Sequence, residues 1–379
     1  MPTPVAAFAA CLPGLEPLLG AELQALGVAA REVPGGAEFD ADPATLQRCG
    51  LWLGTASHVL VRLATFSCRA LGELERKAAA VPFAAWLRDD VPLAVRVTAK
   101  KSRLYHTGAI EERVVRAAQA ALPKLRLAGP ADADGERPAP VAQLAVRMVD
   151  DVCTLSLDTT ATPLHRRGYR LASAKAPLRE DLAHALVLTA RLVSHEAFLD
   201  PFCGAGTLAI EAAGLRLGLP PGRLRPPPLQ HLAAFDARAW RNLLANVEPQ
   251  APGAPIAAGD RDAGAIEAAT ANAARAGVGA AVQFACVALR AQPWLAGDGQ
   301  APSRGALVTN PPFGVRVGQK SDLTPLYQSL GTCVRWLGAG WRAAILAHDP
   351  RLARKTGLPL QVAFSTRIGG LPVAALATT

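Results

Sequence analysis

The sequence has 379 residues, of which 50% are hydrophobic, and its 40 Lys and Arg residues outnumber its 31 Asp and Glu residues. This length can form two or three domains, each with its own core. The short apolar run near the N-terminus has no basic flank and no long apolar run lacks charge, so we expect neither a signal peptide nor a membrane span. The positive surplus favours a polyanionic partner, although arginine also accumulates in GC-rich genomes.

The seven cysteines are scattered along the chain and form no C-x-x-C pair. This pattern indicates neither a disulfide framework nor a zinc site, so we expect no bound metal and a location in the reducing cytoplasm. Cys203 lies in a glycine-rich turn, but no His or Asn pattern nearby supports a nucleophile. We interpret Cys203 as a small packing residue.

The N-terminal region begins with leucines at helical spacing, which predict an amphipathic surface helix that ends at Gly27. These leucines are Leu15, Leu18, Leu19, Leu23 and Leu26. The segment REVPGGAEFD follows as a strand-like turn, and a second helix runs through Leu46, Leu51 and Leu53. A strand over residues 94–97 then leads into KKSRLYHTGAIEERVVRAA, whose second half predicts a helix that carries Ile110, Val114 and Val115.

Three cations, Lys100, Lys101 and Arg103, stand beside Tyr105 and His106 at this strand-to-helix junction. A run of charge is usually only a solvated loop. Cations next to aromatic rings are nevertheless the side chains that hold an RNA backbone and stack on its bases. The three cations are therefore candidate RNA contacts.

Residues 128–140 are rich in Pro, Gly and Ala and predict a flexible surface loop, after which VAQLAVRMV and VCTLSLDT predict alternating strands. The densest basic-aromatic cluster of the chain comes next. It consists of His165, Arg166, Arg167, Tyr169 and Arg170. We favour RNA contact for this cluster over the alternative, a linker that only forms salt bridges.

A helix follows the basic cluster. Pro177 suits its first turn, and four apolar residues at helical spacing predict its buried stripe. These residues are Leu178, Leu182, Leu186 and Val193.

Residues 198–214, FLDPFCGAGTLAIEAAG, predict an apolar strand, a glycine turn and a helix. Asp200 ends the strand, and Gly204 and Gly206 let backbone N–H groups approach a ligand closely. The acidic strand end argues against a phosphate and for a ligand with positive charge or hydroxyl groups. Because the turn lacks both the Gly-Lys-Ser/Thr loop and the third glycine of the dinucleotide fingerprint, an ordinary strand-to-helix turn stays the alternative.

Asp260 is the second acidic candidate, since it ends the strand-like segment APIAAG and precedes a helix that Asp262 is expected to cap. Asp236 lies in a polar, loop-like segment and is the weaker candidate. A plain pair of helix-capping aspartates is the alternative interpretation of Asp260 and Asp262.

The segment LVTNPPFGVRV predicts a strand that runs into Asn310, Pro311, Pro312 and Phe313. Two successive prolines have a fixed φ and no N–H to donate, so they hold the Asn310 side chain and the neighbouring carbonyls in a rigid loop. Open α/β sheets bind ligands at this end of a strand. An amide oxygen, backbone carbonyls and an aromatic face are suited to an exocyclic amino group on a stacked ring.

The C-terminal region begins with VQFACVALR, which predicts another strand. Further on, the pattern predicts a helix over 326–337, a strand over 342–346, a helix near 351–355 and two strands joined at Ile368-Gly369-Gly370. Both glycines permit the φ > 0 geometry of a tight hairpin. The sequence ends at Thr379, and we expect no second catalytic domain.

Together, DPFCGAGT and NPPF resemble the class I methyltransferases that methylate amino groups of nucleic-acid bases with S-adenosylmethionine. The segments GLEPLLGAELQALG and KKSRLYHTGAIEERV, with the HRRGYR junction that precedes Ala176, Pro177, Leu178 and Glu180, are similar to the THUMP-containing enzymes that modify guanine in 23S ribosomal RNA. This resemblance covers nearly the whole chain. It implies an α/β fold, with a Rossmann-like class I methyltransferase domain over 177–379, an α+β ferredoxin-like THUMP-type RNA-binding region over 1–160, and a basic linker over 161–176.

The resemblance also implies residue roles. The cofactor S-adenosyl-L-methionine would contact Asp200, Phe202, Gly204, Gly206, Thr207, Asp260 and Asn310, with its ribose hydroxyls on Asp260. The target amine would be held by Asn310, Pro311, Pro312 and Phe313. Relatives usually place an Asp near the adenine where this chain has Ala288, a departure that bears on cofactor affinity.

The functional hypothesis is therefore methylation of an exocyclic base amine in RNA, with guanine N2 of 23S ribosomal RNA as the first choice. An adenine-N6 methylase acting on DNA or RNA is the nearest alternative, because the Asn-Pro-Pro-aromatic motif serves both amines. The RNA-type N-terminal half argues against DNA. A non-catalytic RNA-binding assembly factor is a third possibility, which only Ala288 favours.

Overall fold

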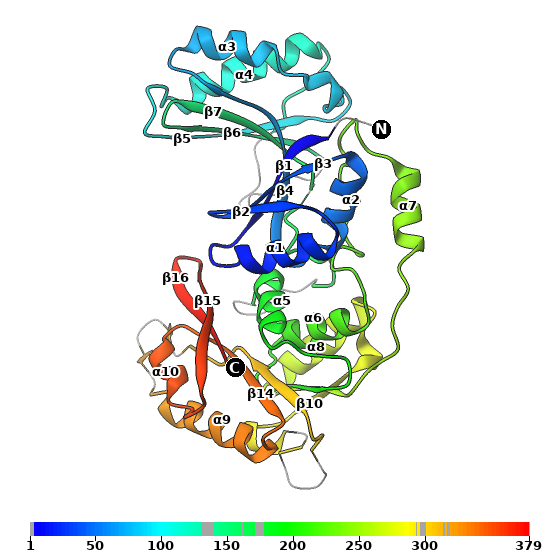
Figure 1. The fold of residues 1–379 in the computed structure, drawn as a ribbon, viewed down its shortest axis with the longest axis vertical. Coiled ribbons are helices and arrows are strands. Elements are labelled where there is room, and N and C mark those ends of the chain that lie inside the picture. The colour runs from blue at the N-terminus through cyan, green and yellow to red at the C-terminus, as the bar shows by residue number, and fades with distance from the viewer. Residues whose placement is uncertain are drawn as a thin grey trace. The chain divides into compact units, whose positions relative to one another are not determined.

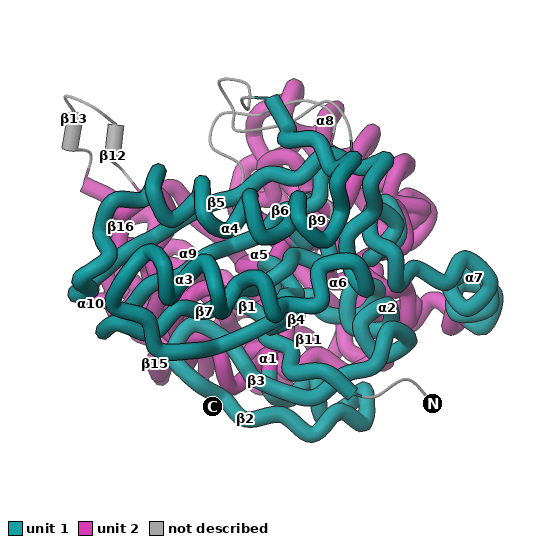
Figure 2. Tube along the Cα trace, turned by 90° about the horizontal axis from the view of Figure 1, so that it is seen from above, with its two compact units in different colours: residues 1–10, 20–164, 226–246 teal, residues 11–19, 165–225, 247–379 magenta. Residues whose placement is uncertain are grey.

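The computed structural model describes residues 4–129, 140–160, 162–170, 178–292, 294–295, 301–313, 315–316, 319–320 and 322–378. The chain divides into two compact units, which Figure 2 shows in different colours. Unit 1 is Met1–Ala10, Gly20–Leu164 and Pro226–Asn246, and unit 2 is Cys11–Leu19, His165–Arg225 and Val247–Thr379. The domain limits expected from the sequence, at residues 160 and 177, stay a prediction.

The first sheet is mixed, and its strand order is β2-β3-β1-β4-β7-β6-β5. Its strands are β1 (Val5–Cys11), β2 (Ala30–Val33), β3 (Gly36–Ala41), β4 (Ala56–Ser67), β5 (Leu93–Lys100), β6 (Ala142–Val149) and β7 (Val152–Asp158). The helices of unit 1 are α2 (Pro43–Trp52), α3 (Leu71–Ala79), α4 (Thr107–Ala121) and α7 (Ala237–Ala245), with a 3-10 turn at Phe83–Ala85. Helix α1 (Glu16–Ala25) begins in unit 2 and ends in unit 1. β5 and β6 are parallel, whereas β6 pairs antiparallel with β7, and β7 with β4.

Alternating side chains explain how this sheet packs. In β6, Leu144, Val146 and Met148 are buried, and the residues between them point the other way. Helices α3 and α4 lie over one side of β5, β6 and β7 (Figure 1), and Ile110 and Val114 of α4 are fully buried. This half of the sheet therefore has one face covered by helices.

The second sheet has the order β10-β9-β8-β11-β14-β16-β15. Its strands are β8 (Ala197–Asp200), β9 (Ile256–Asp260), β10 (Val282–Cys286), β11 (Gly305–Thr309), β14 (Trp341–Ala347), β15 (Leu360–Ile368) and β16 (Leu371–Thr378); β12 (Val315–Arg316) and β13 (Gln319–Lys320) form a separate small ladder. The helices of this unit are α5 (Glu180–Thr189), α6 (Thr207–Arg216), α8 (Ala263–Arg275), α9 (Thr324–Leu337) and α10 (Pro350–Arg354), with 3-10 turns at Gly279–Ala281 and Leu289–Ala291.

Strands β10, β9, β8, β11 and β14 run parallel, and β16 returns antiparallel to both β14 and β15. The predicted Rossmann-like α/β fold is thereby confirmed. The closing hairpin is confirmed as well, because Gly369 (φ 54°) and Gly370 (φ 84°) both adopt the positive φ that a two-residue turn requires.

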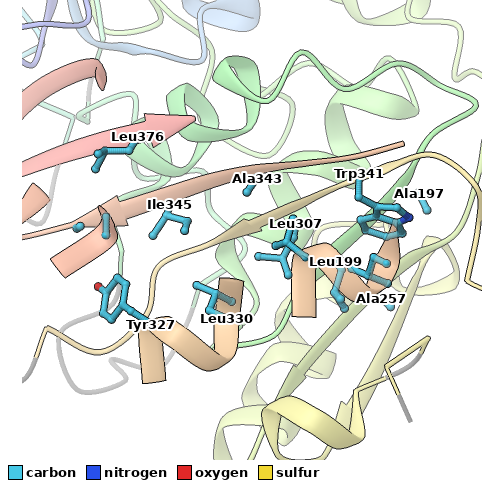
Figure 3. Close-up of a cluster of buried hydrophobic side chains, with 14 of the residues drawn as sticks. Ala197, Leu199, Ala257, Leu307, Tyr327, Leu330, Trp341, Ala343, Ile345 and Leu376 are labelled. Atoms are coloured by element: carbon cyan, nitrogen blue, oxygen red, sulfur yellow. The ribbon is translucent and has the colours of Figure 1, made fainter. Parts of the chain in front are cut away.

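The core on one side of this sheet is a continuous apolar cluster (Figure 3). Leu199, Leu307 and Ile345 from three adjacent strands pack with Tyr327 and Leu330 of α9. Strands covered on both faces read as unbroken apolar runs, as in GALVT of β11, where all five residues are buried. Such a core holds the strand ends, and the loops that follow them, in fixed positions.

Several local expectations are confirmed, and one is wrong. REVPGGAEFD forms the hairpin of β2 and β3, and Asp262 caps α8 through Gly264 N and Ala265 N. Val193 does not belong to the buried stripe, because α5 ends at Thr189 and Val193 is 45% exposed. Asp236 lies outside the helices, as expected, and its carboxylate caps α7 by accepting hydrogen bonds from Arg238 N and Ala239 N.

Two expectations lie outside the described residues. They concern Ala176 and Pro177 at the junction and most of the loop at 128–140. None of the helices in the described parts of the chain is long and apolar enough to cross a membrane.

Candidate active site

The residues expected to bind the cofactor and the target amine follow neighbouring strands at one edge of the second sheet. Because β8, β9, β10 and β11 are parallel, their carboxyl ends meet at that edge. Asp200 is the last residue of β8, Asp260 the last of β9, and Asn310 comes directly after β11. The structure thus brings these three side chains to the same edge.

Asp200 is 1% exposed and uses only one of its two carboxylate oxygens within the protein. The Thr309 hydroxyl donates to its Oδ1 over 2.7 Å, and Phe202 N donates to the same atom over 3.2 Å. Oδ2 is buried without a hydrogen-bond partner. Burial raises the pKa of Asp200 to about 7 against the effect of these two hydrogen bonds, and the Asp260 carboxylate adds to the increase. A cationic group at Oδ2 would favour the ionised form.

The glycine turn is tied to Asp260. Gly204 N–H donates to Asp260 Oδ2 over 3.0 Å, and Asp262 N–H donates to Oδ1 over 3.1 Å. At Gly206 (φ 84°), a Cβ would lie only 3.0 Å from the Ala269 Cβ, so both conformation and space require glycine. At Gly204 a Cβ would meet no atom within 4 Å, which leaves the turn open to a ligand.

The Asn-Pro-Pro-Phe loop presents a second unpartnered acceptor. Asn310 Oδ1 is buried without a hydrogen-bond partner, Pro311 is buried, and Pro312 is exposed. The half-buried ring of Phe313 lies beside His348, with ring centroids 6.3 Å apart and planes tilted by 44°. An amide oxygen next to a partly exposed ring suits a planar ligand that carries an amino group.

The residues at this edge fit S-adenosylmethionine. Its ammonium group and sulfonium are cationic, and Asp200 Oδ2 offers a carboxylate oxygen that lacks a partner. Its ribose hydroxyls suit the Asp260 carboxylate. This carboxylate is not used as the cap of α8, because Asp262 is the cap. The described residues contain no group of three His, Cys, Asp or Glu side chains that could hold a metal ion.

Cys203 is buried in the glycine turn. Burial and the neighbouring Asp200 and Asp260 carboxylates raise the pKa of its thiol. A thiol that stays protonated is a poor nucleophile, so the interpretation as a packing residue holds. Ala288, two residues beyond β10, is exposed and offers only a methyl group at this edge.

Two buried amides support these loops, and sequence reasoning missed both. Asn272 Nδ2 donates over 3.1 Å to the carbonyl of Ala205 inside the glycine turn, and Arg275 bonds to Asn272 Oδ1. Gln292 is fully buried, with Nε2 3.4 Å from the Pro201 carbonyl and 3.3 Å from the Val287 carbonyl. A polar amide among the alanines of a helix was the available signal for Asn272.

We expect Asn272→Ala to weaken binding of S-adenosylmethionine about tenfold, because a lost buried hydrogen bond costs about 1–1.5 kcal/mol. Calorimetric titration with the cofactor measures this. Asn242→Ala, on the exposed surface of α7, is the matched control and should leave the affinity unchanged. Equal affinities in both variants would show that the turn keeps its shape without Asn272.

The basic cluster at 165–170 divides into exposed and buried members. Arg166 is exposed, and half-buried His165 has Nδ1 3.3 Å from Arg179 Nη2. Burial and then Arg179 lower the pKa of His165 to about 4, so the ring is neutral near pH 7. The Arg170 guanidinium donates to Thr207 Oγ1 over 2.7 Å, at the first residue of α6. Arg170 therefore braces the helix that follows the glycine turn.

Arg167 and Tyr169 correct the expectation of RNA contact, because their side chains are buried. Arg167 is 2% exposed, and its Nε lies 3.2 Å from Glu211 Oε1; His184 Nδ1 lies 2.8 Å from Glu211 Oε2. Burial alone would raise the pKa of Glu211, but Arg167 and His184 bring it down to about 2. The Tyr169 carbonyl accepts from Arg275 Nε over 2.7 Å. These residues hold the segment against α5, α6 and α8.

We expect Arg167→Lys to lower the free energy of unfolding by about 1.5–3 kcal/mol, because an ammonium group cannot reproduce the paired contacts of a guanidinium with Glu211. Thermal melting would show the loss as a lower transition temperature. Arg166→Lys is the control, and we expect its transition to stay within about 0.5 kcal/mol of the parent. A normal melt together with weaker RNA binding in Arg167→Lys would instead return Arg167 to the RNA-contacting set.

The remaining candidate RNA contacts, Lys100, Lys101 and Arg103, belong to unit 1 and are exposed. Their loop is ordered by Asp151, which accepts from Arg103 N over 2.7 Å and from Arg69 Nε over 3.0 Å. These cations therefore lie on a loop whose conformation is fixed by hydrogen bonds to Asp151.

Comparisons with known proteins agree with this geometry. Residues 167–363 match the family model described as RMKL-like, methyltransferase domain, and residues 6–60 match the model described as RlmL ferredoxin-like domain. The chain is 34% identical to ribosomal RNA large subunit methyltransferase K/L of Syntrophotalea carbinolica, over 98% of this chain and 53% of that protein. The chain thus spans about half the length of this relative.

Two further relatives match almost end to end. A putative RNA methyltransferase of Synechocystis sp. is 31% identical over 96% of this chain and 94% of its own length. A crystal structure of a putative methyltransferase complexed with SAH has a TM-score of 0.85 and 24% identity, and covers 100% of this chain and 98% of the other. At that identity, the second likeness shows the fold alone.

Proposed function

Because the chain belongs to the family of RMKL-like methyltransferases, we propose that it transfers a methyl group from S-adenosylmethionine to an exocyclic base amine in RNA, namely guanine N2 of 23S ribosomal RNA. The RNA methyltransferase relatives and the ferredoxin-like match over residues 6–60 support RNA as the substrate. The choice of guanine N2 rests on the sequence resemblance.

One observation carries the proposal. Two buried acceptor oxygens, Asp200 Oδ2 and Asn310 Oδ1, lack partners at the ends of the neighbouring strands β8 and β11, and the glycine turn that follows β8 has open space at Gly204. An unpartnered buried acceptor is costly unless a ligand satisfies it. The carboxylate suits a cation, whereas the neutral amide suits an amine hydrogen.

In this proposal the protein acts by positioning. An exocyclic base amine is a poor nucleophile, because its lone pair is delocalised into the ring. Asn310 Oδ1 and the Pro311 carbonyl would accept hydrogen bonds from its two N–H groups, which would direct the lone pair to the cofactor and stabilise positive charge as it develops. When bound, the cofactor would supply an electrophilic methyl group to the amine nitrogen, with the sulfur as the leaving group that keeps the electron pair of the broken C–S bond.

The base itself would stack on Phe313, after being turned out of the RNA. The methylated ammonium is acidic enough to lose its extra proton to water, so the reaction requires no His or Glu base. His348, whose ring lies beside that of Phe313, would then support the stacking surface and would not transfer a proton.

Mass spectrometry of nucleosides from a strain lacking the gene, compared with its parent, tests the proposal. Loss of N2-methylguanosine from the large ribosomal RNA would support it. A change confined to transfer RNA would identify transfer RNA as the substrate instead. A change in N6-methyladenine would favour adenine N6 as the methylated amine. If no nucleoside changes and calorimetry detects no cofactor binding, a non-catalytic role is the better interpretation.

A further inference from the structure

One face of the sheet in unit 1 is not covered by helices α3 and α4. Of the residues expected to form a site, only Lys100 lies on this face. Helices α3 and α4 lie over the other side of β5, β6 and β7 (Figure 1). The strand register shows which side chains share the open side, because residues paired across neighbouring strands point to the same face. We call this side the open sheet face.

Three transverse rows make up the open sheet face. The first row is Arg96, Ala145, Ser156 and Arg62; the second is Thr98, Arg147, Thr154 and Thr65; the third is Lys100, Val149, Val152 and Ser67. Cations therefore occur in every row. Ser156 is buried, whereas the hydroxyl residues Thr98, Thr65 and Ser67 of the other two rows are exposed. From strand geometry, the Cα atoms of Arg96 and Arg147 are about 8 Å apart.

The positive charge on this face is largely uncompensated. Arg96, Lys100 and Arg147 are exposed, and their side chains form no ion pair with any residue that the structure describes. Asp158, at the end of β7, is the acidic residue in line with Ser156; it is buried and bonded to His58 and Thr160. A polyanion would find several free cations here and no exposed carboxylate among the three rows.

The surroundings of Arg62 also contain more positive than negative charge. Its guanidinium stacks 4.6 Å above the Phe8 ring, contacts Ser156 Oγ over 3.4 Å and lies 3.8 Å from Glu38. Glu38 also pairs with Arg31, so two arginines share one carboxylate. Burial lowers the pKa of Arg62, Glu38 opposes this, and Arg147 lowers the pKa further. Arg62 and Arg147 are thus close enough to repel each other.

The open sheet face leads directly into the basic loop after β5. Lys101 and Arg103 continue from Lys100, and the Tyr105 ring is 66% exposed, with its centroid 4.1 Å from that of His106. An exposed aromatic ring at the end of a row of cations offers a place for a base to stack. Large exposed apolar side chains, which would indicate a protein or lipid partner, are limited to Val152 in the three rows.

We propose that the open sheet face, through Arg62, Arg96, Lys100 and Arg147, binds the phosphate backbone of single-stranded RNA next to a base stacked on Tyr105. This deepens the proposed function, since it gives unit 1 a defined contact with the RNA substrate. The cations would contact phosphates and the hydroxyls would contact sugars, so binding should depend weakly on sequence and strongly on salt.

The double variant Arg96→Gln/Arg147→Gln tests this, with a fluorescently labelled single-stranded RNA of mixed sequence as the probe. We expect the dissociation constant to rise at least tenfold. We also expect the slope of log affinity against log salt to decrease in magnitude by about 1.4, because each lost phosphate contact on a single strand removes about 0.7. Arg96→Lys/Arg147→Lys should keep the slope, since the charges remain.

The matched control is Arg76→Gln/Arg116→Gln, which removes the same two charges from the exposed surfaces of α3 and α4. Equal changes in the two Gln variants would overturn the proposal, because net charge alone would then explain the loss. An unchanged affinity and slope in Arg96→Gln/Arg147→Gln would overturn it as well. The assay needs no methyl transfer, so an inactive protein whose RNA binding still depends on these arginines would refute only the proposed function.

Discussion

Replacing Asn310 with alanine should lower kcat for methyl transfer at least about 10³-fold, while the affinity for S-adenosylmethionine changes less than about threefold. The amide oxygen is buried and unpartnered in the protein, and in the proposed function it contacts the amine whose charge changes during the reaction. Removing one such preorganised group typically costs about 10²–10³ in kcat. The loss of orientation adds to this cost. Single-turnover kinetics and calorimetry measure the two quantities separately.

The variant Asn310→Gln separates orientation from chemistry. It keeps the amide but shifts it by one methylene, and a misplacement of about 1 Å can cost about 10²-fold. We therefore expect a loss of activity between that of Asn310→Ala and the parent. If Asn310→Ala lost cofactor binding as well as turnover, Asn310 would be a structural residue of the loop after β11, and the proposed role in catalysis would fail.

The parts of this protein that sequence patterns predicted are those whose causes are local. Asp262 caps α8 from two and three residues away, and Gly369 and Gly370 form their turn by their own conformational freedom. The parallel core strands were found because burial on both faces leaves an unbroken apolar run, as in β11.

The features that were missed depend on partners far along the chain. Asn272 reaches a carbonyl 67 residues away, and Gln292 reaches one 91 residues away. Arg167 looked like a surface cation because its segment is basic, but Glu211, 44 residues later, buries it. Pairing across such distances is set by tertiary packing, which no local spacing encodes.

The open sheet face was hidden for a related reason. Arg96 and Arg147 are 51 positions apart in the sequence, and each has an apolar residue directly before and after it in its own strand. Only the register of β5 against β6 shows that they share one face. A search for runs of charge therefore finds the loop at residues 100–103 and misses the surface that it borders.

Asp200 should make cofactor binding depend on pH. Its pKa of about 7 means that the carboxyl is largely protonated below neutrality, whereas a cationic cofactor group prefers the ionised form. Affinity should therefore rise as pH increases towards about 7 and level off above it, with a proton released on binding at lower pH. Calorimetry in buffers of different ionisation enthalpy measures both effects.

Asp200→Asn is the decisive variant. Its amide oxygen can still accept from Thr309 and Phe202, but the charge is gone, so we expect affinity about tenfold to a hundredfold weaker above pH 7, with a flat pH profile. Asp262→Asn, at the cap of α8, is the control that should keep the profile. If Asp200→Asn kept both the affinity and the pH dependence, the cationic group would lie elsewhere.

The raised pKa of Asp200 also determines how the free energy of unfolding of the cofactor-free protein changes with pH. The folded pKa lies above the ordinary value of 3.8, so the folded protein holds a proton that the unfolded chain releases between about pH 4 and 7. Stability from this group is full below pH 4 and is lost as pH rises, by about 4 kcal/mol over the window. Asp200→Asn removes the titration, so its stability relative to the parent should increase from pH 4 to 7 in denaturant unfolding. A constant difference would mean that the buried carboxyl has an ordinary pKa, and the cofactor would then meet a carboxylate that is already ionised.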